Sequence, residues 1–432
     1  MATTASHVPM TRPNEVLAEH HTDHGHSVSW VQLDSGRIIM CGAGQFASSD
    51  DGGLTWSEPY DPRQGDDPLK GSVTGLAKLD GDALGVTLFM RKTGPNNPYD
   101  RLLFCTSTDQ GHTWSAPVVI NTGPSAGAYQ DTLMRTSSGR IIQPAHMSMG
   151  KGTYHQEGAP FVGGLVNGHY VSTDAHFYDP HFICSNVYYS DDMGQSWQCN
   201  HDGEIIIVLG YGGHFEGCPE PSVCEVTPGK LLMLMRTRLG RLYQAWSYDD
   251  GETWSRPQPT QLASTQAPAQ IRALPNGHLL CVFTQQSADE VRKGFIRTRL
   301  SSTISRNGGG VWEFFQNIES IHEQTHVEPG PIEIVRPAAG YSMLEAAAFE
   351  NDVRHVGELP VGYGRWSYPS VLVLKDRVLI SHTYSYHDET GNTADIGYNN
   401  KMKVLPLPWF YGGMDPDMPS SLLAKLAQAP KP

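Results

Sequence analysis

The chain has 432 residues, of which 39% are hydrophobic, 9% aromatic and 18% charged, and its formal net charge at pH 7 is −14. This acidic balance argues against nucleic acid or an anionic membrane as the main partner, because both require a basic surface. The 45 glycines and 30 prolines supply many turns, and the hydrophobic content suffices for a large core of short strands. Length alone does not divide the chain into several domains, because some closed all-β units are this large.

Two absences shape what we expect of location and cofactors. No apolar stretch of 18 residues occurs, and the first nine residues lack a basic start followed by an apolar run, so we expect a cytoplasmic protein without a membrane span.

The 7 cysteines are scattered, which favours buried free thiols over a zinc site or a disulfide framework, with a Cys218–Cys224 link as the alternative. The histidine-rich tract from His20 to His26 lacks cysteine and a fixed spacing, which favours a solvated approach over a metal site. We therefore expect neither a metal nor a cofactor.

In chain order, the polar residues 1–23 come first and predict an N-terminal arm or a closing strand. From there a short hairpin recurs, in which an apolar strand, a turn and a second apolar strand follow one another. Six copies are present, at residues 27–42, 72–91, 131–146, 220–236, 268–284 and 368–385. They predict one unit over residues 24–410 that is built from six similar sheets, followed by a C-terminal tail over residues 411–432.

A second motif, an octet of the form Ser-x-Asp-x-Gly-x-(Thr/Ser)-Trp, follows most of these hairpins. Full copies lie at Ser49–Trp56, Ser107–Trp114, Ser190–Trp197 and Ser247–Trp254, and Ser305–Trp312 is a degraded copy with Asn in place of Asp. The Asp accepts hydrogen bonds from backbone amides two residues on, and the Gly takes the positive φ of a tight reversal, so the octet predicts a turn between strands. Its Trp is expected to pack against a neighbouring unit. We interpret the octet as structural.

The octet tryptophans are separated by 58, 83, 57 and 58 residues. A repeat of about this length is typical of propeller blades, each a four-stranded sheet around a central channel, so the chain is predicted to be all-β, a six-bladed β-propeller. The long interval contains an insertion at residues 147–185. A second insertion, residues 322–365, contains the one stretch with a clear helical pattern, Leu344–Val356. Loops of this length are more often binding lids than neutral extensions, so both are expected to border a site.

The propeller topology sorts residues onto two faces. Because the hairpin turns and the octet turns lie on one face, the opposite face carries the starts of the first strands, the ends of the second strands and the onward loops. The residues there are almost all ionisable or hydrogen-bonding: His26, Arg91, Asp131, His146, Glu220, Arg236, Gln285, Arg365, Tyr368, His382 and Tyr384. Strand ends are often polar without a functional reason, so it is the joint pattern that indicates a site at the mouth of the channel.

Several arginines of this set come from different blades. Convergent guanidinium groups grip carboxylate, sulfate or phosphate, which predicts an anionic small-molecule or oligosaccharide substrate. The alternative is that each arginine pairs with a nearby acid and holds the blades together. The substrate-binding residues that we expect are Arg91, Arg236, Arg365, Arg272, His26 and His382.

The catalytic candidates are Glu220, Tyr368, Asp131 and His146. Glu220 and Asp131 are carboxylates on adjacent blades, which is the material for glycoside hydrolysis. Tyr368 beside Glu220 allows a second arrangement, in which a carboxylate activates a phenol. His146 and His382 can move protons near neutral pH, and with Tyr and Arg they suit abstraction of a proton next to a uronate carboxylate. The residues alone leave these chemistries open.

The octets and the run Glu220-Pro-Ser-Val-Cys-Glu-Val-Thr-Pro-Gly-Lys-Leu-Leu-Met-Leu-Met-Arg236 resemble the sialidase (neuraminidase) superfamily and its relatives with BNR repeats, also called Asp-boxes. The resemblance spans roughly residues 24–405 and implies a sialidase-like propeller. It also implies that Glu220 assists a Tyr nucleophile, and that Arg236 belongs to an arginine triad holding the carboxylate of sialic acid. Tyr368, in Tyr-Pro-Ser, is similar to the nucleophilic Tyr, and Arg365 is a weaker match to the third Arg.

Two stretches depart from the sialidase pattern. Where sialidases carry an Arg-Ile-Pro motif in blade one, this chain reads His26-Ser-Val-Ser-Trp30. Their acid/base Asp lies in the loop after the next strand, and here that loop is only Gly42-Ala-Gly-Gln45. The resemblance is therefore closest to the broad group of sialidase-like BNR proteins that retain the Glu and the Arg but differ at the first blade.

From these observations we expect a carbohydrate-active enzyme, a glycoside hydrolase that acts on an acidic or highly polar sugar. One alternative is a polysaccharide or uronate lyase that uses His146, Tyr368 and an Arg. A second alternative is a glycan-binding propeller without catalysis. The particular sugar, the stereochemical outcome and the oligomeric state are left open by the sequence.

Overall fold

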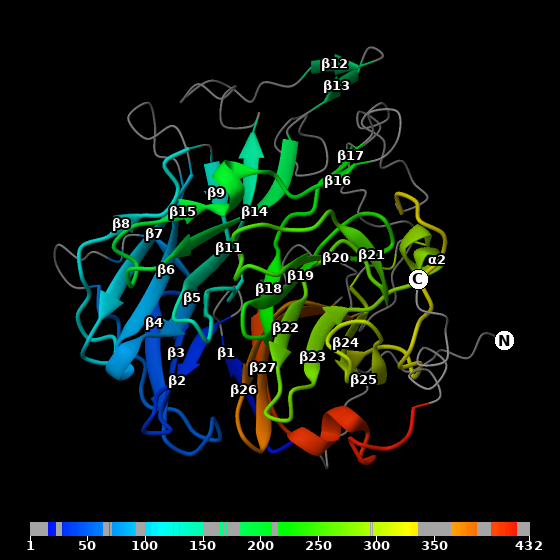
Figure 1. Cartoon of the computed structure of the whole chain (residues 1–432). Coiled ribbons are helices and arrows are strands. Elements are labelled where there is room, and N and C mark those ends of the chain that lie inside the picture. Colours follow the sequence, from blue (N-terminus) through cyan, green and yellow to red (C-terminus); the bar gives the residue numbers. More distant parts are fainter. Residues whose placement is uncertain are drawn as a thin grey trace.

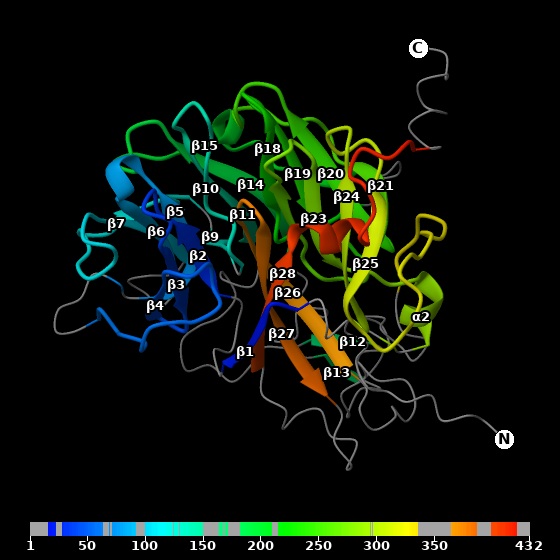
Figure 2. The same cartoon turned by 90° about the horizontal axis from the view of Figure 1, so that it is seen from below.

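The computed structural model describes residues 16–22, 28–63, 69, 71–91, 100–123, 125–128, 130–149, 164–166, 169–171, 182–209, 215–293, 295, 297–335, 364–386 and 399–420. These residues form a ring of six sheets around a central axis, as Figures 1 and 2 show from two directions. The prediction of an all-β, six-bladed propeller is confirmed.

Each blade is an antiparallel sheet whose first strand lies nearest the axis. Blade one contains β2 (Ser29–Gln32), β3 (Ile38–Gly42) and β4 (Gln45–Ser49); blade two contains β5 (Ser72–Lys78), β6 (Leu84–Met90), β7 (Arg101–Ser107) and β8 (Val118–Val119). Blade three contains β9 (Ser125–Gly127), β10 (Met134–Arg135), β11 (Ile141–Met149), β14 (Phe182–Ser190) and β15 (Gln198–Cys199). Blade four contains β18 (Ser222–Thr227), β19 (Lys230–Met235), β20 (Arg241–Ser247) and β21 (Gln258–Ala263).

Blade five contains β22 (Gln270–Ala273), β23 (Leu279–Thr284), β24 (Arg299–Ser305) and β25 (Glu313–Ser320); blade six contains β26 (Gly364–Val373), β27 (Arg377–Tyr386), β28 (Asn399–Pro406) and β1 (Ala18–Thr22). Two further hairpins pair β12 (Gly164–Val166) with β13 (His169–Val171) and β16 (Val208–Leu209) with β17 (Phe215–Glu216). The helical turns are α2 (Ala288–Arg292), η2 (Asp80–Asp82), η3 (Asn200–Gly203) and η5 (Leu407–Tyr411).

The ring is closed by the N-terminal segment. β1 pairs with β28 as the outermost strand of blade six, with Ala18 opposite Val404 and Thr22 opposite Asn400. Residues 18–22 thus form a closing strand, and the expected bounds of the N-terminal segment, residues 1–23, stay a prediction. At the other end, Trp409, Phe410 and Tyr411 of η5 are buried between blades five and six, so the expected boundary after residue 410 falls within this turn.

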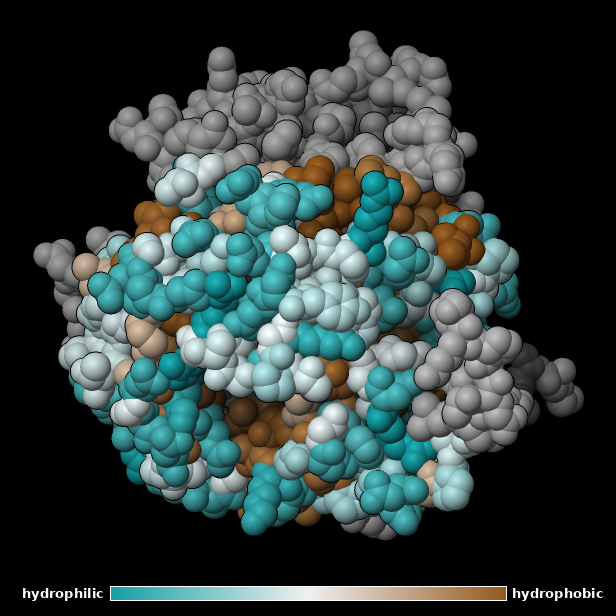
Figure 3. All heavy atoms as spheres, viewed as in Figure 1, coloured by the Kyte–Doolittle hydropathy of each residue, from teal (hydrophilic) through white to brown (hydrophobic). Residues whose placement is uncertain are grey.

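The hydrophobic core is divided into clusters that lie between neighbouring blades. One cluster joins blades one and two through Phe46 and Leu88, and another joins blades six and one through Leu379 and Trp30. Similar clusters occupy the other four interfaces. Burial between blades, rather than within one sheet, is thus what holds the ring together. Hydrophilic residues cover most of the face in Figure 3, and hydrophobic ones show mainly in its recesses and beside the grey residues.

The octets form turns whose hydrogen bonds differ in register from the expected ones. Asp51 accepts from the amide of Thr55, four residues on, and from the Ser49 hydroxyl, which itself accepts from the amide of Gly53. The expectation of a bond to the amide two residues on was wrong, because the loop is wider than an Asx turn. The Trp packs against the preceding blade as expected: the ring centroid of Trp114 lies 5.6 Å from that of Phe46 in blade one.

Three inner strands whose expected first residue is a site candidate begin elsewhere. β10 begins at Met134 rather than Asp131, β18 begins at Ser222 rather than Glu220, and β26 begins at Gly364 rather than Tyr368. Glu220 and Tyr368 have φ angles of +57° and +52°, which a regular strand does not accommodate. The apolar pattern of these segments does not reveal such backbone angles.

The division into two faces is confirmed by contacts between turns. Arg37, in the hairpin turn of blade one, pairs with Asp50 in the octet of the same blade, and Arg140 pairs with Asp191 in blade three. The hairpin turns and the octet turns therefore share one face. The opposite face carries the hairpin β12–β13, which stands above the ring in Figure 1. His26, the Leu344–Val356 stretch and most of the insertion at residues 147–185 lie outside the described residues.

All seven cysteines are free, as expected, so the alternative of a Cys218–Cys224 disulfide is wrong. Six of them are buried, and burial raises the pKa of the thiols of Cys184, Cys218 and Cys224 to about 12. Among the described residues, no helix is long and apolar enough to cross a membrane.

Candidate functional site

Glu220, Arg236 and Tyr368 meet at the mouth face, and we refer to them as the Glu220 cluster. The phenol of Tyr368 donates to Oε1 of Glu220 at 2.9 Å, and Nη1 of Arg236 is bonded to the other carboxylate oxygen. Nη1 of Arg236 also lies 3.3 Å from the Tyr368 oxygen, so each residue contacts the other two. Glu220 is 6% exposed and Arg236 is 9% exposed. The structure thus brings together Glu220 and Tyr368, which the sequence paired as base and phenol, with Arg236, which it assigned to substrate binding.

Local structure explains how the three side chains converge. Glu220 lies just before β18 and Arg236 lies just after β19, and these two strands form one hairpin in which Ser222 pairs with Leu234. Tyr368 belongs to β26 of blade six, where the pairing with β27 shifts between Ser367 and Ser370. Pro369 follows Tyr368 and has no amide to give to the sheet, which is consistent with a bulge at this position. The positive φ of Glu220 and Tyr368 costs on the order of 1–3 kcal/mol each, a strain that is characteristic of functional sites.

The surroundings of the Glu220 cluster lower the pKa of the Glu220 carboxyl and raise the pKa of the Tyr368 phenol. Burial alone would raise the pKa of Glu220. Electrostatic attraction by Arg236, and to a smaller extent by His146, opposes this and holds the pKa below its ordinary value. Burial raises the pKa of Tyr368, and the negative charge of Glu220 raises it further. The resting site therefore contains an ionised carboxylate that accepts a hydrogen bond from a neutral phenol.

Arg297 lies beside the Glu220 cluster, although the sequence reasoning did not select it. Its guanidinium carbon is 5.4 Å from the centre of the Tyr368 ring, and its Nη1 donates to Oγ of Ser367 at 3.1 Å. Its backbone is anchored on both sides, because its amide donates to Gln286 Oε1 at 2.7 Å and its carbonyl accepts from the amide of Trp366 at 2.8 Å. Arg297 comes from the loop between β23 and β24, which the topology assigns to the mouth face. The topology therefore placed this loop beside the site, but the candidates were chosen from strand ends and not from within the loop.

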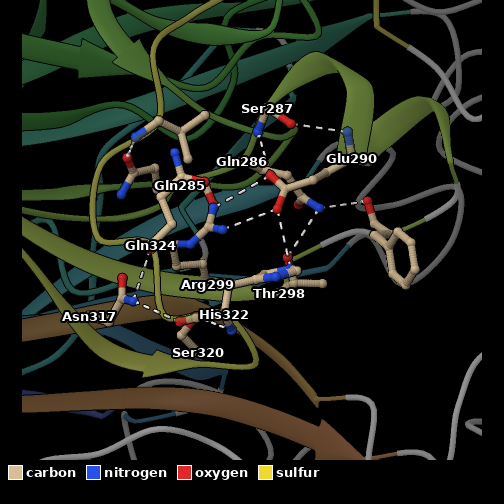
Figure 4. A network of polar contacts seen from close by, with 12 residues as sticks. Gln285, Gln286, Ser287, Glu290, Thr298, Arg299, Asn317, Ser320, His322 and Gln324 are labelled. Atoms are coloured by element: carbon tan, nitrogen blue, oxygen red, sulfur yellow. Dashed lines mark hydrogen bonds and ion pairs between the residues drawn. The ribbon is translucent and has the colours of Figure 1, made fainter. Parts of the chain in front are cut away.

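A polar network holds the loop that presents Arg297 (Figure 4). Ser287 caps α2, and the carboxylate of Glu290 receives the Ser287 amide, Arg299 and His322. Gln285, a candidate from the sequence, is buried in the same network, where it bonds the backbone of Thr325 and Val327. Its described contacts support this loop and do not reach the Glu220 cluster.

His146 is buried on β11 opposite Gly127 of β9. A Cβ at position 127 would lie 2.8 Å from Nε2 of His146, so the glycine leaves the room that the imidazole fills. Electrostatic interaction with His146 lowers the pKa of Glu220, so the imidazole lies within electrostatic range of the Glu220 cluster.

Asp131 and Arg272 lie in the channel. Oδ2 of Asp131 accepts from Ser370 at 3.2 Å and lies 3.6 Å from Nη2 of Arg272, and Oδ1 accepts from the amide of Leu76. Burial raises the pKa of Asp131 to about 6, although Arg272 opposes the rise. The described contacts of Asp131 do not include the Glu220 carboxylate, so the structure does not pair these two acids.

The remaining candidates occupy other places. Arg91 is exposed directly after β6, and Arg365 is half-buried in β26 opposite Ser385. His382 is fully buried between blades five and six, with Nε2 3.6 Å from Oε1 of Glu319. Tyr384 lies at the ring's outer closure, where its hydroxyl is 3.2 Å from Nδ1 of His21. The binding roles of Arg91, Arg365 and His382 stay predictions, and His26 lies outside the described residues.

Within the described part of the chain, no group of three or more His, Cys, Asp and Glu residues has a geometry that could hold a metal ion. The Glu220 cluster contains one base, one hydroxyl that is a nucleophile once deprotonated, and the guanidinium group of Arg236, which can bind an anion.

Comparison with known proteins gives a consistent family signal. A family model described as a BNR repeat-like domain matches residues 85–380. A Hadza microbial sialidase is 14% identical with a TM-score of 0.52, over 92% of this chain and 67% of its own. A Dyadobacter fermentans protein of unknown function is 14% identical with a TM-score of 0.54, over 90% and 98% of the two chains. The leech intramolecular trans-sialidase is 13% identical with a TM-score of 0.53, over 91% and 69%. At these identities the similarity concerns the fold, and no curated protein sequence matches the chain.

Proposed function

The chain belongs to the BNR repeat-like domain family, and we propose that it is a glycosidase that acts on an acidic sugar with Tyr368 as nucleophile and Glu220 as its base. The observation that carries the proposal is the 2.9 Å hydrogen bond from the Tyr368 phenol to an ionised, buried Glu220. A phenol in this position loses its proton along an existing hydrogen bond as it attacks, so no charged nucleophile has to be formed beforehand.

In the proposed first step, the Tyr368 oxygen bonds to the anomeric carbon, its proton passes to Glu220, and the bond from that carbon to the leaving oxygen breaks. The leaving oxygen must gain a proton, and we assign this role to His146, which lies within electrostatic range of Glu220. In the second step, water replaces Tyr368 at the anomeric carbon. The water gives one proton to His146, and Tyr368 recovers its own from Glu220, which restores the starting state.

The acidic group of the substrate is assigned to Arg236 and Arg297. Nη1 of Arg236 lies 3.3 Å from the Tyr368 oxygen and the guanidinium carbon of Arg297 lies 5.4 Å from the centre of the Tyr368 ring, so a carboxylate bound by them would stand next to the nucleophile. Planar guanidinium groups bind carboxylates through two parallel hydrogen bonds. The leech relative was solved with 2,7-anhydro-Neu5Ac, and a carboxylated sugar of that class is the substrate that we propose.

The test is a panel of aryl glycosides of neutral and acidic sugars, with release of the aryl group followed by absorbance and the sugar product by mass. We expect turnover only with carboxylated sugars, and a loss of at least about 10³-fold in Tyr368→Phe and in Glu220→Gln. The matched control is Asp191→Asn, which breaks an ion pair on the opposite face and should leave turnover unchanged. Equal turnover of neutral and acidic sugars would contradict the assignment of Arg236 and Arg297.

A uronate lyase is the second candidate, because His146 interacts electrostatically with Glu220 and, when its imidazole is neutral, can accept a proton next to a carboxylate. A lyase leaves an unsaturated sugar that absorbs in the near ultraviolet and takes up no water, whereas the glycosidase incorporates ¹⁸O from labelled water into its product. A binding propeller without catalysis would instead keep its affinity in Glu220→Gln and turn over no glycan.

A further inference from the structure

The inner strand of blade three bulges into the central channel. Its two segments, β9 and β10, both pair with β11, but between the pairs Gly127 with His146 and Met134 with Ile142 the inner strand has six residues and β11 has three. The extra residues push Gln130 and Asp131 toward the axis. Both are buried, with 2% and 3% of their surface exposed.

These two residues contact every other blade. Asp131 reaches blade one through the Ser29 hydroxyl, blade two through the Leu76 amide and blade six through the Ser370 hydroxyl. The backbone carbonyl of Asp131 accepts from two side chains of blade five, at 2.6 Å from Gln270 and 2.8 Å from Arg272. Gln130 donates to the carbonyls of Glu220 in blade four and Ala269 in blade five, at 3.4 and 3.2 Å. The bulge is thus a meeting point of all six blades.

Two of these contacts lie at or next to the Glu220 cluster. Gln130 holds the carbonyl of Glu220, the residue with a φ of +57°. Asp131 holds Ser370, which stands two residues after Tyr368 at the point where the pairing of β26 with β27 resumes. A left-handed residue needs support from its surroundings, and here both such residues are supported from the same bulge.

We propose that Gln130 and Asp131 are positioning residues that set the distance between the Glu220 carboxylate and the Tyr368 phenol. The inference rests on the proposed function of that pair, and it gives Asp131 a role other than proton transfer to substrate. Its carboxylate oxygens are already engaged by Leu76, Ser370 and Arg272, and it has almost no exposed surface through which a sugar could reach it. A shift of about 1 Å between catalytic groups costs up to about 100-fold in rate.

The experiment compares Asp131→Asn, Asp131→Ala and Ser370→Ala in the full chain, with Asp191→Asn as the control on the opposite face. Position 368 is replaced by 3-fluorotyrosine, so that its ¹⁹F resonance and its titration report the phenol without any need for turnover. We expect Asp131→Ala and Ser370→Ala to move the resonance and the titration midpoint, whereas Asp131→Asn, which keeps the shape, leaves both near those of the parent. The same variants with ordinary tyrosine at position 368 are assayed for turnover of the acidic glycoside.

In that assay we expect kcat to fall roughly 10- to 100-fold in Asp131→Ala with KM within about twofold, and to fall less than about threefold in Asp131→Asn. If Asp131 instead exchanged protons with substrate, Asp131→Asn would be as slow as Asp131→Ala and would lose one limb of the pH–rate profile, which overturns the inference. An unchanged ¹⁹F signal in both Asp131→Ala and Ser370→Ala also overturns it. Should Asp131→Ala fail to fold, Ser370→Ala alone decides. Absence of turnover with a displaced ¹⁹F signal contradicts the proposed function and leaves the positioning role supported.

Discussion

The phenol of Tyr368 in blade six donates a 2.9 Å hydrogen bond to Glu220 of blade four, 148 residues away in the sequence. Neither residue continues a regular strand, because both have a positive φ. Removing the hydroxyl in Tyr368→Phe takes away the proposed nucleophile, so we expect turnover to fall at least about 10³-fold. Affinity for the acidic sugar should change little, because the guanidinium groups remain. Calorimetry with a non-hydrolysable analogue measures this, and a lost affinity would assign Tyr368 to binding.

Arg236 neutralises a carboxylate that is almost fully buried. In Arg236→Met the carboxylate of Glu220 stays buried without its main partner, so we expect the free energy of unfolding at pH 7 to fall by about 3–5 kcal/mol. The double variant Arg236→Met/Glu220→Gln should recover most of this loss, because no unpaired charge remains. Urea denaturation of the parent, Arg236→Met, Glu220→Gln and the double variant measures the coupling energy between the two residues. Equal stability of the single and double variants would show that Glu220 is not held as an anion.

The period and the faces of the propeller could be predicted from the sequence, because they depend on local chemistry. Turn residues recur at fixed spacing, and each Trp packs against the blade before it, so the pattern is readable without knowing distant contacts. Glu220, Arg236 and Tyr368 were likewise found because they flank or interrupt apolar strands at the mouth face.

The parts that could not be predicted depend on contacts between blades. Arg297 lies in an ordinary polar loop, and only the network of Gln286 and Glu290 brings it over Tyr368. Asp131 looks like a catalytic acid in the sequence, yet the bulge turns it into the channel, where Ser370 and Arg272 engage it. No periodicity encodes which blade supplies the partner of a buried charge.

The buried carboxyl of Asp131 predicts a pH-dependent stability with a defined sign. Its pKa rises from 3.8 to about 6 on folding, so the folded state binds the proton more tightly than the unfolded state. The contribution to stability is therefore fully present below about pH 4 and is lost as the pH rises through about 6. Asp131→Asn mimics the neutral form, and we expect it to be more stable than the parent at pH 8 by about 3 kcal/mol and equally stable near pH 4. Denaturation at the two pH values tests this, and a less stable Asp131→Asn at pH 8 would contradict it.

The octet turns predict a stability effect without a catalytic one. Asp249 accepts bonds from the Ser247 hydroxyl at 2.7 Å and the Thr253 amide at 2.9 Å. Asp249→Ala leaves those donors without a partner, so we expect a loss of about 1–3 kcal/mol in the free energy of unfolding. Turnover should be unchanged, since the octets lie on the face opposite the Glu220 cluster. Glu252→Ala, an exposed position of the same turn, is the control, and a loss of activity in the folded Asp249→Ala protein would contradict the separation of the two faces.

A cluster of buried charges predicts how the ring stays closed. Oε1 of Glu319 lies 3.0 Å from Nζ of Lys401 and 2.7 Å from Nζ of Lys403, and both lysines also lie 3.7 Å from Glu19 of the closing strand β1. Burial would raise the pKa of Glu319, but His382 and the two lysines hold it well below its usual range, so its contribution to stability is present at neutral pH and is lost as the pH falls.

Glu319→Gln leaves these two lysines buried without their shared carboxylate, so we expect a loss of about 3–5 kcal/mol and faster amide exchange in β1 and β28 than elsewhere. Glu328→Gln, at an exposed position, is the control. The same variant examines His382, whose only described charged neighbours belong to this cluster. Glu319→Gln also removes the partner of the His382 imidazole and should displace it. If His382 binds substrate, affinity for the acidic sugar should then fall. An unchanged affinity in the folded variant would instead assign His382 to the closure of blade six.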